Sequence, residues 1–404
     1  MKIFLKVIFS LGFLTSALPS QWQVISNQGN EALSVPSINI AYSTSNGITK
    51  KTTNGGYNWT SLSGGNLTGI FFINDLTGWV VGYPGYIGYT TNGSSFVQQQ
   101  TGVSDRLNDV FFIDPNTGWV VGGDFSVERI FKTTNAGVNW ISQTSGTANK
   151  LFSVYFLNTN TGYSVGGPSS PKIIKTTDGG ATWVSQYTSA GTPLYSVMFA
   201  DVNTGWAVAG YIGGETIIKT TNGGINWFSQ SSGDNRYLRA CFVLNSNKAF
   251  AVGQSGKVIY TTNGGDNWYV ESTGSSIELW SVKFANDTVG YAIGDNVVLK
   301  TTSGGLSFVD ERKDHIPGNY LLYRNFPNPF NPSTIIKYSL PQASHIIIKV
   351  YNTTGNEITN LIDKMQGPGS YGIRWDGSKY PSGIYFYRMT AGDFNSTGKM
   401  VLLK

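Results

Sequence analysis

A set of charged and aromatic residues lies between the apolar segments of the first three-quarters of the chain. Arginine binds carboxylates through paired hydrogen bonds, and tyrosine and tryptophan supply large contact areas with a polar tip. Carried on variable loops, these residue types suit the recognition of a protein or a glycan. The candidate binding residues are Arg106, Asp124, Glu128, Arg129, Tyr211, Glu215, Arg236, Arg239 and Trp280, with Tyr83 and Tyr86 nearby.

Carboxylate-based hydrolysis is the catalytic alternative. A glycosidase needs two carboxyl groups about 5–9.5 Å apart, and the fold alone sets that separation. The sequence contains no phosphate-binding loop, no Ser–His–Asp candidate and no redox pair of cysteines. We therefore expect a binding scaffold that is not an enzyme, and we keep a secreted glycoside hydrolase as the alternative. The glutamates open to a carboxylate pair are Glu31, Glu128, Glu215, Glu271 and Glu278.

Metal and cofactor chemistry has little support in the residue types. The two histidines, His315 and His345, are too few and too far apart for a zinc site. The single cysteine, Cys241, lies in a strand pattern, so it forms no internal disulfide and is expected to be a small buried hydrophobe. We expect no metal and no cofactor.

The segments that must position the candidate residues repeat seven times. One copy reads Lys175-Thr-Thr-Asp-Gly-Gly-Ala-Thr-Trp183, and successive copies lie 37 to 44 residues apart. A fixed period near 40 indicates one supersecondary unit that is copied and stacked, because a single unit cannot bury its own apolar face. The aromatic residues that close the copies are Trp59, Phe96, Trp140, Trp183, Trp227, Trp268 and Phe308.

Each period reads as four short strands. Leu151–Phe156 alternates and is rich in aromatic and β-branched residues, as is typical of a half-buried strand. Two further strands follow before the turn at Asp178, and Trp183 opens the fourth. Four strands per period, repeated seven times, predict a seven-bladed β-propeller over residues 21–309, within an all-β protein. The loops that join the blades, and those between second and third strands, then gather the candidate binding residues on one face.

The repeated turn resembles the Asp-box hairpin of BNR-repeat propellers. The match is close at Thr176-Thr-Asp-Gly-Gly-Ala-Thr-Trp183 and looser in the other copies. Short Asx side chains accept hydrogen bonds from the backbone of their own turn, so we expect these turns to stabilise the fold and not to bind a ligand. The residues at the Asp position are Asn54, Asn92, Asn135, Asp178, Asn222, Asn263 and Ser303.

Two families share these repeats. Residues 22–308 resemble propellers related to photosystem II stability/assembly factors, on phrases such as Thr77-Gly-Trp-Val-Val-Gly82. This resemblance implies the fold, and it leaves a role as assembly factor for a membrane complex as the second alternative. Sialidases also carry Asp-boxes, and resemblance to them would require an arginine triad. The predicted propeller has only four arginines, Arg106, Arg129, Arg236 and Arg239, with none in the first blade.

The N-terminal end and the charge balance bear on location. Residues 1–20 carry two lysines, an apolar run and small residues, as is typical of a secretory signal peptide cut after Ala17 or near Ser20. No later stretch reaches 18 apolar residues, so no membrane-spanning segment is expected. Residues 21–308 hold 15 Lys and Arg against 16 Asp and Glu. This near-neutral, scattered charge does not favour nucleic-acid binding, and we expect a monomer.

The period stops after Phe308. Residues 310–318 are a linker by composition, and residues 319–404 form a separate unit. Its strand-like runs are expected at Thr334–Ser339, His345–Tyr351, Tyr371–Trp375, Gly383–Thr390 and Gly398–Leu403. Short strands at this spacing, with Gly and Pro turns, predict a small immunoglobulin-like β-sandwich.

This last unit resembles the type A sorting domain of the bacterial type IX secretion system. The matching phrases include Asn325-Phe-Pro-Asn-Pro-Phe-Asn-Pro332, Ser382-Gly-Ile-Tyr-Phe-Tyr387 and Lys399-Met-Val-Leu-Leu-Lys404. The resemblance implies that residues 319–404 engage the type IX machinery. It also implies export through the periplasm of a Gram-negative bacterium to the outer-membrane surface or the medium. An ordinary immunoglobulin-like module is the alternative.

Closure of the ring is left open by the sequence. The segment Gln21-Trp-Gln-Val-Ile-Ser26 looks like a fourth strand without a blade. It is a candidate to complete the last blade, in competition with the strand that begins at Phe308.

Overall fold

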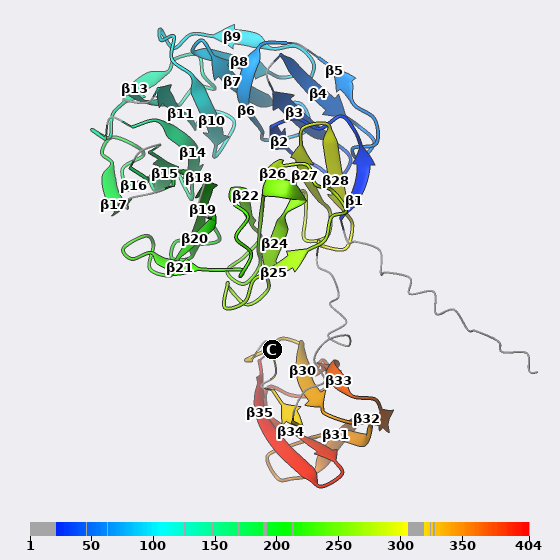
Figure 1. Cartoon of the computed structure of the whole chain (residues 1–404). Coiled ribbons are helices and arrows are strands. Elements are labelled where there is room, and N and C mark those ends of the chain that lie inside the picture. Colours follow the sequence, from blue (N-terminus) through cyan, green and yellow to red (C-terminus); the bar gives the residue numbers. More distant parts are fainter. Residues whose placement is uncertain are drawn as a thin grey trace, which may run out of the picture. The chain divides into compact units, whose positions relative to one another are not determined.

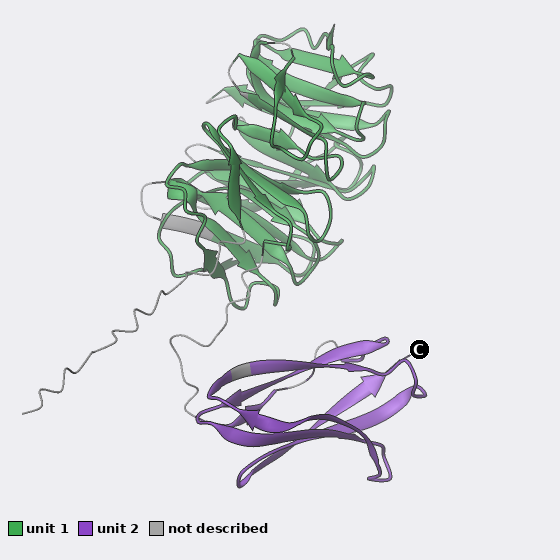
Figure 2. Ribbon diagram, turned by 90° about the vertical axis from the view of Figure 1, so that its right-hand side faces the viewer, with its two compact units in different colours: residues 1–307 green, residues 308–404 purple. Residues whose placement is uncertain are grey.

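The structure is a computed structural model that describes residues 22–45, 47–62, 64–124, 127–147, 149–167, 170–188, 192–211, 214–305, 319–323, 325 and 328–403. The side chains of residues 45, 211, 214–216 and 370 are not part of the description. The predicted signal peptide, the predicted linker and Phe308 therefore lie outside the described residues. The chain divides into two compact units, residues 1–307 and 308–404 (Figure 2).

The first unit contains seven four-stranded antiparallel sheets arranged around a centre (Figure 1). Blade 1 consists of β2 (Ala32–Ser34), β3 (Ala41–Ser45), β4 (Ile48–Thr52) and β5 (Thr60–Ser61). Blade 2 consists of β6 (Asn66–Phe72), β7 (Gly78–Tyr83), β8 (Tyr86–Thr90) and β9 (Val97–Gln99). Blade 3 consists of β10 (Leu107–Phe112), β11 (Gly118–Asp124), β12 (Val127–Thr133) and β13 (Ile141–Gln143). Blade 4 consists of β14 (Leu151–Phe156), β15 (Gly162–Gly166), β16 (Lys172–Thr176) and β17 (Val184–Thr188).

The remaining blades follow the same order. Blade 5 consists of β18 (Leu194–Phe199), β19 (Gly205–Tyr211), β20 (Gly214–Thr220) and β21 (Phe228–Gln230). Blade 6 consists of β22 (Leu238–Val243), β23 (Ala249–Gly253), β24 (Val258–Thr261) and β25 (Tyr269–Glu271), with a short 3₁₀ turn, η1 (Gln254–Gly256). Blade 7 consists of β26 (Leu279–Phe284), β27 (Gly290–Gly294), β28 (Val297–Thr301) and β1 (Gln23–Ser26). The predicted all-β class and the seven-bladed propeller are confirmed.

The first strand of blades 2–7 has a bulge that the sequence pattern does not reveal. In blades 2–7 the pairing register shifts directly after the leading leucine, for example between Leu107 and Asp109. The bulge also changes the burial pattern of β10, β14, β18 and β22. Strict alternation is replaced by the order buried, half-buried, half-buried, buried, half-buried, buried. A bulge places two residues opposite one partner residue. In blades 3–5 two successive side chains, such as Asn108 and Asp109, therefore face the centre of the ring.

The repeated turns are held by a threonine and an Asx side chain. In blade 4 the Thr176 hydroxyl donates to the Asp178 carboxylate at 2.8 Å and accepts the N–H of Gly180 at 2.8 Å. The Asp178 carboxylate also accepts the backbone N–H and the hydroxyl of Thr182. These hydrogen bonds lower the pKa of Asp178 to about 2. Gly180 has φ of 97°, and a Cβ there would meet the Gln143 side chain at 2.1 Å, so only glycine fits.

The lysine that opens the repeated phrase joins one blade to the next. Lys175 and Lys219 donate to the carbonyls of Gly223 and Gly264 in the following blades, at 2.7 and 2.6 Å. Lys300 of blade 7 donates in the same way to Gly55 of blade 1, at 2.9 Å. The repeated cation thus has a structural role between blades.

The N-terminal strand β1 closes the ring. It pairs antiparallel with β28, with Gln23 opposite Lys300, and lies beside it in Figure 1. Trp22 is fully buried and packs edge-on against Phe284, with ring centroids 5.8 Å apart. Trp183 packs edge-on against Phe156 at 5.9 Å in blade 4. In blade 7, Trp22 therefore takes the place of a closing aromatic.

Trp22 also bonds to the turn of blade 7. Its indole N–H donates to the Gly305 carbonyl at 3.3 Å, as Trp59 donates to Gly56 in blade 1 at 2.9 Å. The segment that looked like a fourth strand without a blade is thus the fourth strand of blade 7.

The second unit is a sandwich of two antiparallel sheets. One sheet contains β29 (Leu321–Leu322), β30 (Ser333–Leu340) and β33 (Gly369–Asp376). The other contains β32 (Glu357–Gln366), β31 (Ser344–Tyr351), β34 (Gly383–Ala391) and β35 (Phe394–Leu402). The five predicted runs correspond to five of these strands. The long edge strand β32 was missed because two register shifts against β31 and many charged residues obscure its alternation.

Among the described residues, no helix is long and apolar enough to cross a membrane.

Candidate functional site

One end of the propeller channel forms a mouth with a volume of about 360 Å³. The bulged first strands supply it, because the residue after the leading leucine in blades 2–7 lines this mouth. Blade 1 contributes Glu31, directly before β2, and blades 3 and 4 add the residues that precede their leucines. We call these residues the mouth ring: Glu31, Thr68, Arg106, Asn108, Lys150, Phe152, Tyr195, Arg239 and Trp280.

Arg239 is the centre of an aromatic cluster in the mouth ring. Its guanidinium carbon lies 4.8 Å from the Tyr195 ring centroid and 4.6 Å from that of Trp280. The Tyr237 ring lies 4.9 Å away. Arg239 Nε also pairs with Glu278 at 2.5 Å, and Glu278 accepts the Tyr237 hydroxyl at 3.0 Å. The charge of Arg239 is therefore largely balanced, and the ring faces around it are occupied.

Arg106 and Lys150 differ from Arg239 in having no acidic residue in direct contact among the described residues. Within the described part of the chain, neither side chain makes a hydrogen bond or an ion pair, and both are half-buried. Burial lowers the pKa of Lys150, the charge of Arg106 lowers it further, and Asp124 opposes them. Burial and Asp295 raise the pKa of Glu31, while Arg106 opposes the rise. Two neighbouring cations thus stand at the mouth, with Glu31 as the opposing charge within the ring.

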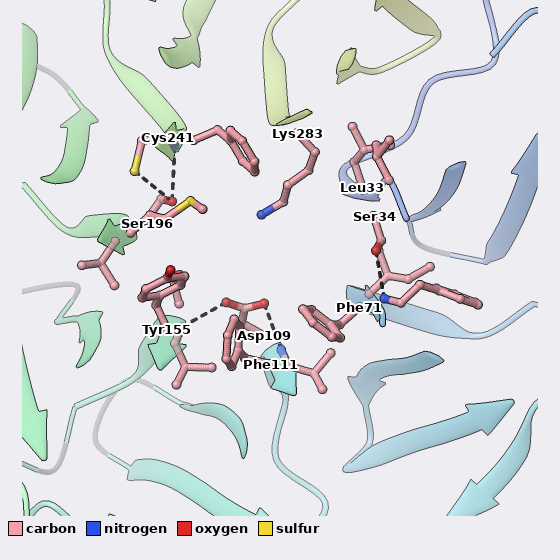
Figure 3. Close-up of a pocket in the computed structure, with 18 of the residues that line it drawn as sticks. Leu33, Ser34, Phe71, Asp109, Phe111, Tyr155, Ser196, Cys241 and Lys283 are labelled. Atoms are coloured by element: carbon pink, nitrogen blue, oxygen red, sulfur yellow. Dashed lines mark hydrogen bonds between the residues drawn. The ribbon is translucent and has the colours of Figure 1, made fainter. Parts of the chain in front are cut away.

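Below the mouth, the same strands enclose a second cavity of about 200 Å³ (Figure 3). The residues four positions after the leading leucines form a collar around this cavity. One comes from each of blades 2–7: Phe71, Phe111, Tyr155, Met198, Phe242 and Lys283. Adjacent collar rings touch, with centroids of Phe71 and Phe111 at 5.3 Å and those of Phe111 and Tyr155 also at 5.3 Å. The channel is therefore an aromatic enclosure with a single lysine.

The carboxylate of Asp109 and the ammonium of Lys283 face each other across this cavity (Figure 3). The Asp109 carboxylate of blade 3 accepts the N–H of Val110 at 2.9 Å and that of Val154, in blade 4, at 3.0 Å. Burial raises the pKa of Asp109 despite these bonds and the charge of Lys283.

Cys241, predicted as a small buried hydrophobe, is buried, and burial raises the pKa of its thiol to about 11. The thiol is therefore protonated and unreactive at neutral pH.

Several candidate binding residues instead hold the loops of this face together. Arg129 pairs with Asp105 at 2.7 Å. Arg236 pairs with Asp234 at 2.6 Å and lowers the pKa of that carboxyl to about 2. Glu128 accepts hydrogen bonds from the loop at residues 144–147.

The remaining candidates divide as follows. Asp124 is exposed at the end of β11, and Tyr83 is exposed at the end of β7. Tyr211 and Glu215 lie in the β19–β20 hairpin, where the backbone of Tyr211 pairs with Gly214 and that of Glu215 with Gly210. Their side chains lie outside the description. Of the nine candidates, the structure thus brings Arg106, Arg239 and Trp280 together at the mouth.

Sequence reasoning missed Glu31, Lys150, Phe152 and Tyr195 at the mouth, and it missed the channel pair Asp109 and Lys283. The position after the repeated leucine could have found Phe152 and Tyr195, because it holds Asn108, Phe152, Tyr195, Arg239 and Trp280 in successive blades. The described residues contain no group of three or more His, Cys, Asp or Glu side chains that could hold a metal ion.

Two family models match parts of the chain. Residues 324–403 match the secretion system C-terminal sorting domain, and residues 89–230 match the photosynthesis system II assembly factor YCF48. A search of curated proteins found no match. The predicted resemblance to both families is confirmed. The sorting domain indicates a protein that is secreted or carried at the cell surface.

Solved structures share the fold at low sequence identity. YCF48 bound to D1 peptide is 16% identical with a TM-score of 0.59, and the match covers 70% of this chain and 96% of that one. YCF48 from Cyanidioschyzon merolae is 17% identical with a TM-score of 0.56, over 70% and 98% of the two chains. PorZ, a surface component of the type-IX secretion system of Porphyromonas gingivalis, is 14% identical with a TM-score of 0.53. That match covers 92% of this chain but only 59% of PorZ.

Proposed function

We propose that this propeller, which carries a secretion system C-terminal sorting domain, is exported to the cell surface or medium and binds an acidic segment of a partner protein at its channel mouth. The observation that carries the proposal is the pair of adjacent cations, Arg106 and Lys150, without an acidic partner among the described residues. Holding two half-buried like charges together costs free energy, and an anion from a partner would offset that cost.

The aromatic cluster favours a protein partner over a glycan. Sugars usually stack on the open faces of aromatic rings, whereas Arg239 lies over the rings of Tyr195 and Trp280. This arrangement instead presents a rigid rim of aromatic and arginine side chains, the types that dominate protein-binding hot spots. A structure of a similar propeller, YCF48, has a bound D1 peptide, which supports a peptide as the occupant.

The catalytic alternative has less support from the geometry. Of the four propeller arginines, only Arg106 and Arg239 line the mouth, since Arg129 and Arg236 are paired with Asp105 and Asp234. A sialidase-like arginine triad is therefore not gathered there. Glu278 is engaged by Arg239 and Tyr237, which leaves Glu31 as the mouth-ring carboxylate that makes no hydrogen bond among the described residues. We infer binding and not hydrolysis.

The test measures binding of a fluorescent peptide rich in Asp and Glu to the full chain. The double variant Arg106→Ala with Lys150→Ala should weaken binding by at least roughly a hundredfold, since each of the two charged contacts contributes about 1.5–3 kcal/mol. Binding should also weaken as salt is added. Fluorescence anisotropy at two ionic strengths measures both effects.

Lys364→Ala is the matched control, because this exposed lysine lies in the second unit. It should leave the affinity unchanged. Equal affinity of wild type and the Arg106/Lys150 variant for the peptide would contradict the proposal. Hydrolysis of a glycan panel by the wild type, abolished by Glu31→Gln, would replace binding with glycosidase activity.

A further inference from the structure

The channel below the mouth contains the ammonium group of Lys283. The Lys283 ammonium points into the cavity in Figure 3, and in the described part of the chain it makes no hydrogen bond or ion pair. Its contact is the Phe242 ring, 5.9 Å from the nitrogen. Removing an ammonium from water is costly unless an anion or acceptor compensates. The site is thus prepared for a negatively charged group.

An acidic group faces the same cavity from the other side. Asp109 belongs to blade 3 and Lys283 to blade 7, and Figure 3 shows both pointing inward. The N–H groups of Val110 and Val154 and the Ser153 hydroxyl hold the carboxylate, which keeps a remaining lone pair for a further donor. Opposite charges therefore stand on opposite walls, near enough for Lys283 to act on the ionisation of Asp109.

Aromatic rings form much of the wall between these charges, with the hydroxyls of Ser153 and Ser196 beside them, and the cavity is large enough for one ring. Phe71, Phe111, Tyr155 and Phe242 surround the cavity of about 200 Å³. An apolar cavity of about 150 Å³ holds benzene, so this volume accommodates a single ring or a branched alkyl group. A ligand that fits must combine an apolar body with a positive and a negative group.

We propose that the channel binds a free α-amino acid with an apolar side chain. Its carboxylate contacts Lys283, its ammonium contacts Asp109, and its side chain packs within the aromatic collar. A simple anion would place its negative charge beside Asp109, and a simple amine would place its positive charge beside Lys283. This site is separate from the proposed peptide contact, which uses Arg106 and Lys150 at the mouth.

The test is calorimetry of the full chain with four probes. L-phenylalanine should bind, whereas hydrocinnamate, which lacks the ammonium, and phenethylamine, which lacks the carboxylate, should bind roughly tenfold to a hundredfold more weakly. Glycine, which lacks the side chain, should also bind more weakly. Equal binding of hydrocinnamate and L-phenylalanine, or no binding of L-phenylalanine, would overturn the proposal.

Two variants separate the charges. Lys283→Met should weaken L-phenylalanine by at least about tenfold and leave the fold intact, because it removes a cation that pairs with nothing in the described chain. Asp109→Asn should weaken the binding of L-phenylalanine, whereas hydrocinnamate should bind as well as before or better. Misfolding would not produce this pair of changes. Lys364→Met, an exposed lysine of the second unit, is the control. Unchanged L-phenylalanine affinity in Lys283→Met would also refute the site.

Discussion

Glu128 illustrates how a residue expected to bind a ligand can instead hold a loop of the propeller in place. Its carboxylate accepts the Thr144 hydroxyl at 2.6 Å, the Ser145 N–H at 2.6 Å and the Gly146 N–H at 3.0 Å. The Thr147 hydroxyl donates at 2.7 Å. Burial raises the pKa of Glu128, but these bonds outweigh burial and leave the pKa below its ordinary value. Glu128 thus fixes the loop that leads to Lys150.

We expect Glu128→Gln to destabilise the propeller by roughly 1–3 kcal/mol near neutral pH, because the amide turns two donors toward groups that are donors themselves. A lowered folded pKa contributes stability that is present above the ordinary glutamate pKa of about 4.3 and is lost as pH falls through the folded value. The difference in the free energy of unfolding between wild type and variant should therefore narrow below roughly pH 4. Thermal unfolding across pH measures it, with Asp266→Asn, at an exposed turn, as control. A gap that stays constant down to acid pH would contradict this role.

Part of the binding face could be predicted at the residue scale. Variable loops on a repeated scaffold correctly place Arg106, Arg239 and Trp280 at one mouth. Which arginines stay unpaired is decided by neighbours distant in sequence, such as Glu278 for Arg239, 39 positions away. The channel pair was not predictable, because alternation alone does not show that a bulge turns Asn108 and Asp109 toward the same side.

At the scale of elements, β1 is the strand that completes the last blade. Trp22 is buried among Phe250, Phe284 and neighbouring aliphatic residues of blades 6 and 7. The period of the sequence predicted seven blades, but it could not decide between two candidate closing strands. Burial of the Trp22 indole and its bond to Gly305 distinguish the first candidate.

Trp22→Ala should lower the free energy of unfolding of the propeller by about 3–5 kcal/mol, the usual cost of deleting a large buried aromatic. Val24→Ala on the same strand is the matched control, since that side chain is 49% exposed and should change stability by no more than about 0.5 kcal/mol. Urea denaturation followed by tryptophan fluorescence compares them. Equal midpoints for wild type and Trp22→Ala would show that β1 does not hold the ring closed.

At the scale of the whole molecule, the two units carry different features. The propeller carries the candidate sites, and the second unit matches a secretion sorting domain. Each unit has its own buried core, with Trp375 and Tyr387 in that of the sandwich. A sorting unit with its own core is suited to act as a signal that is independent of the cargo.

Deleting residues 319–404 should leave the propeller folded but retained in the periplasm of a bacterium with type IX machinery. The physical reason is that the export signal is lost while every described propeller strand remains. Cell fractionation with an antibody to the propeller measures the distribution, and the full chain serves as control. Arrival of the truncated chain at the surface or in the medium at the normal level would refute the assignment.

The closing strand has a consequence for how the ring folds. Trp22 and Gly305 are 283 positions apart in the chain, so their contact has the longest sequence separation of the described hydrogen bonds in the propeller. Contacts between distant residues form slowly, because loop closure has an entropic cost before the contact stabilises anything. The blades can assemble in order from neighbouring segments, whereas β28 keeps an open edge until β1 arrives. Ring closure is therefore the late step, and a chain delayed there offers an unpaired strand edge to other chains.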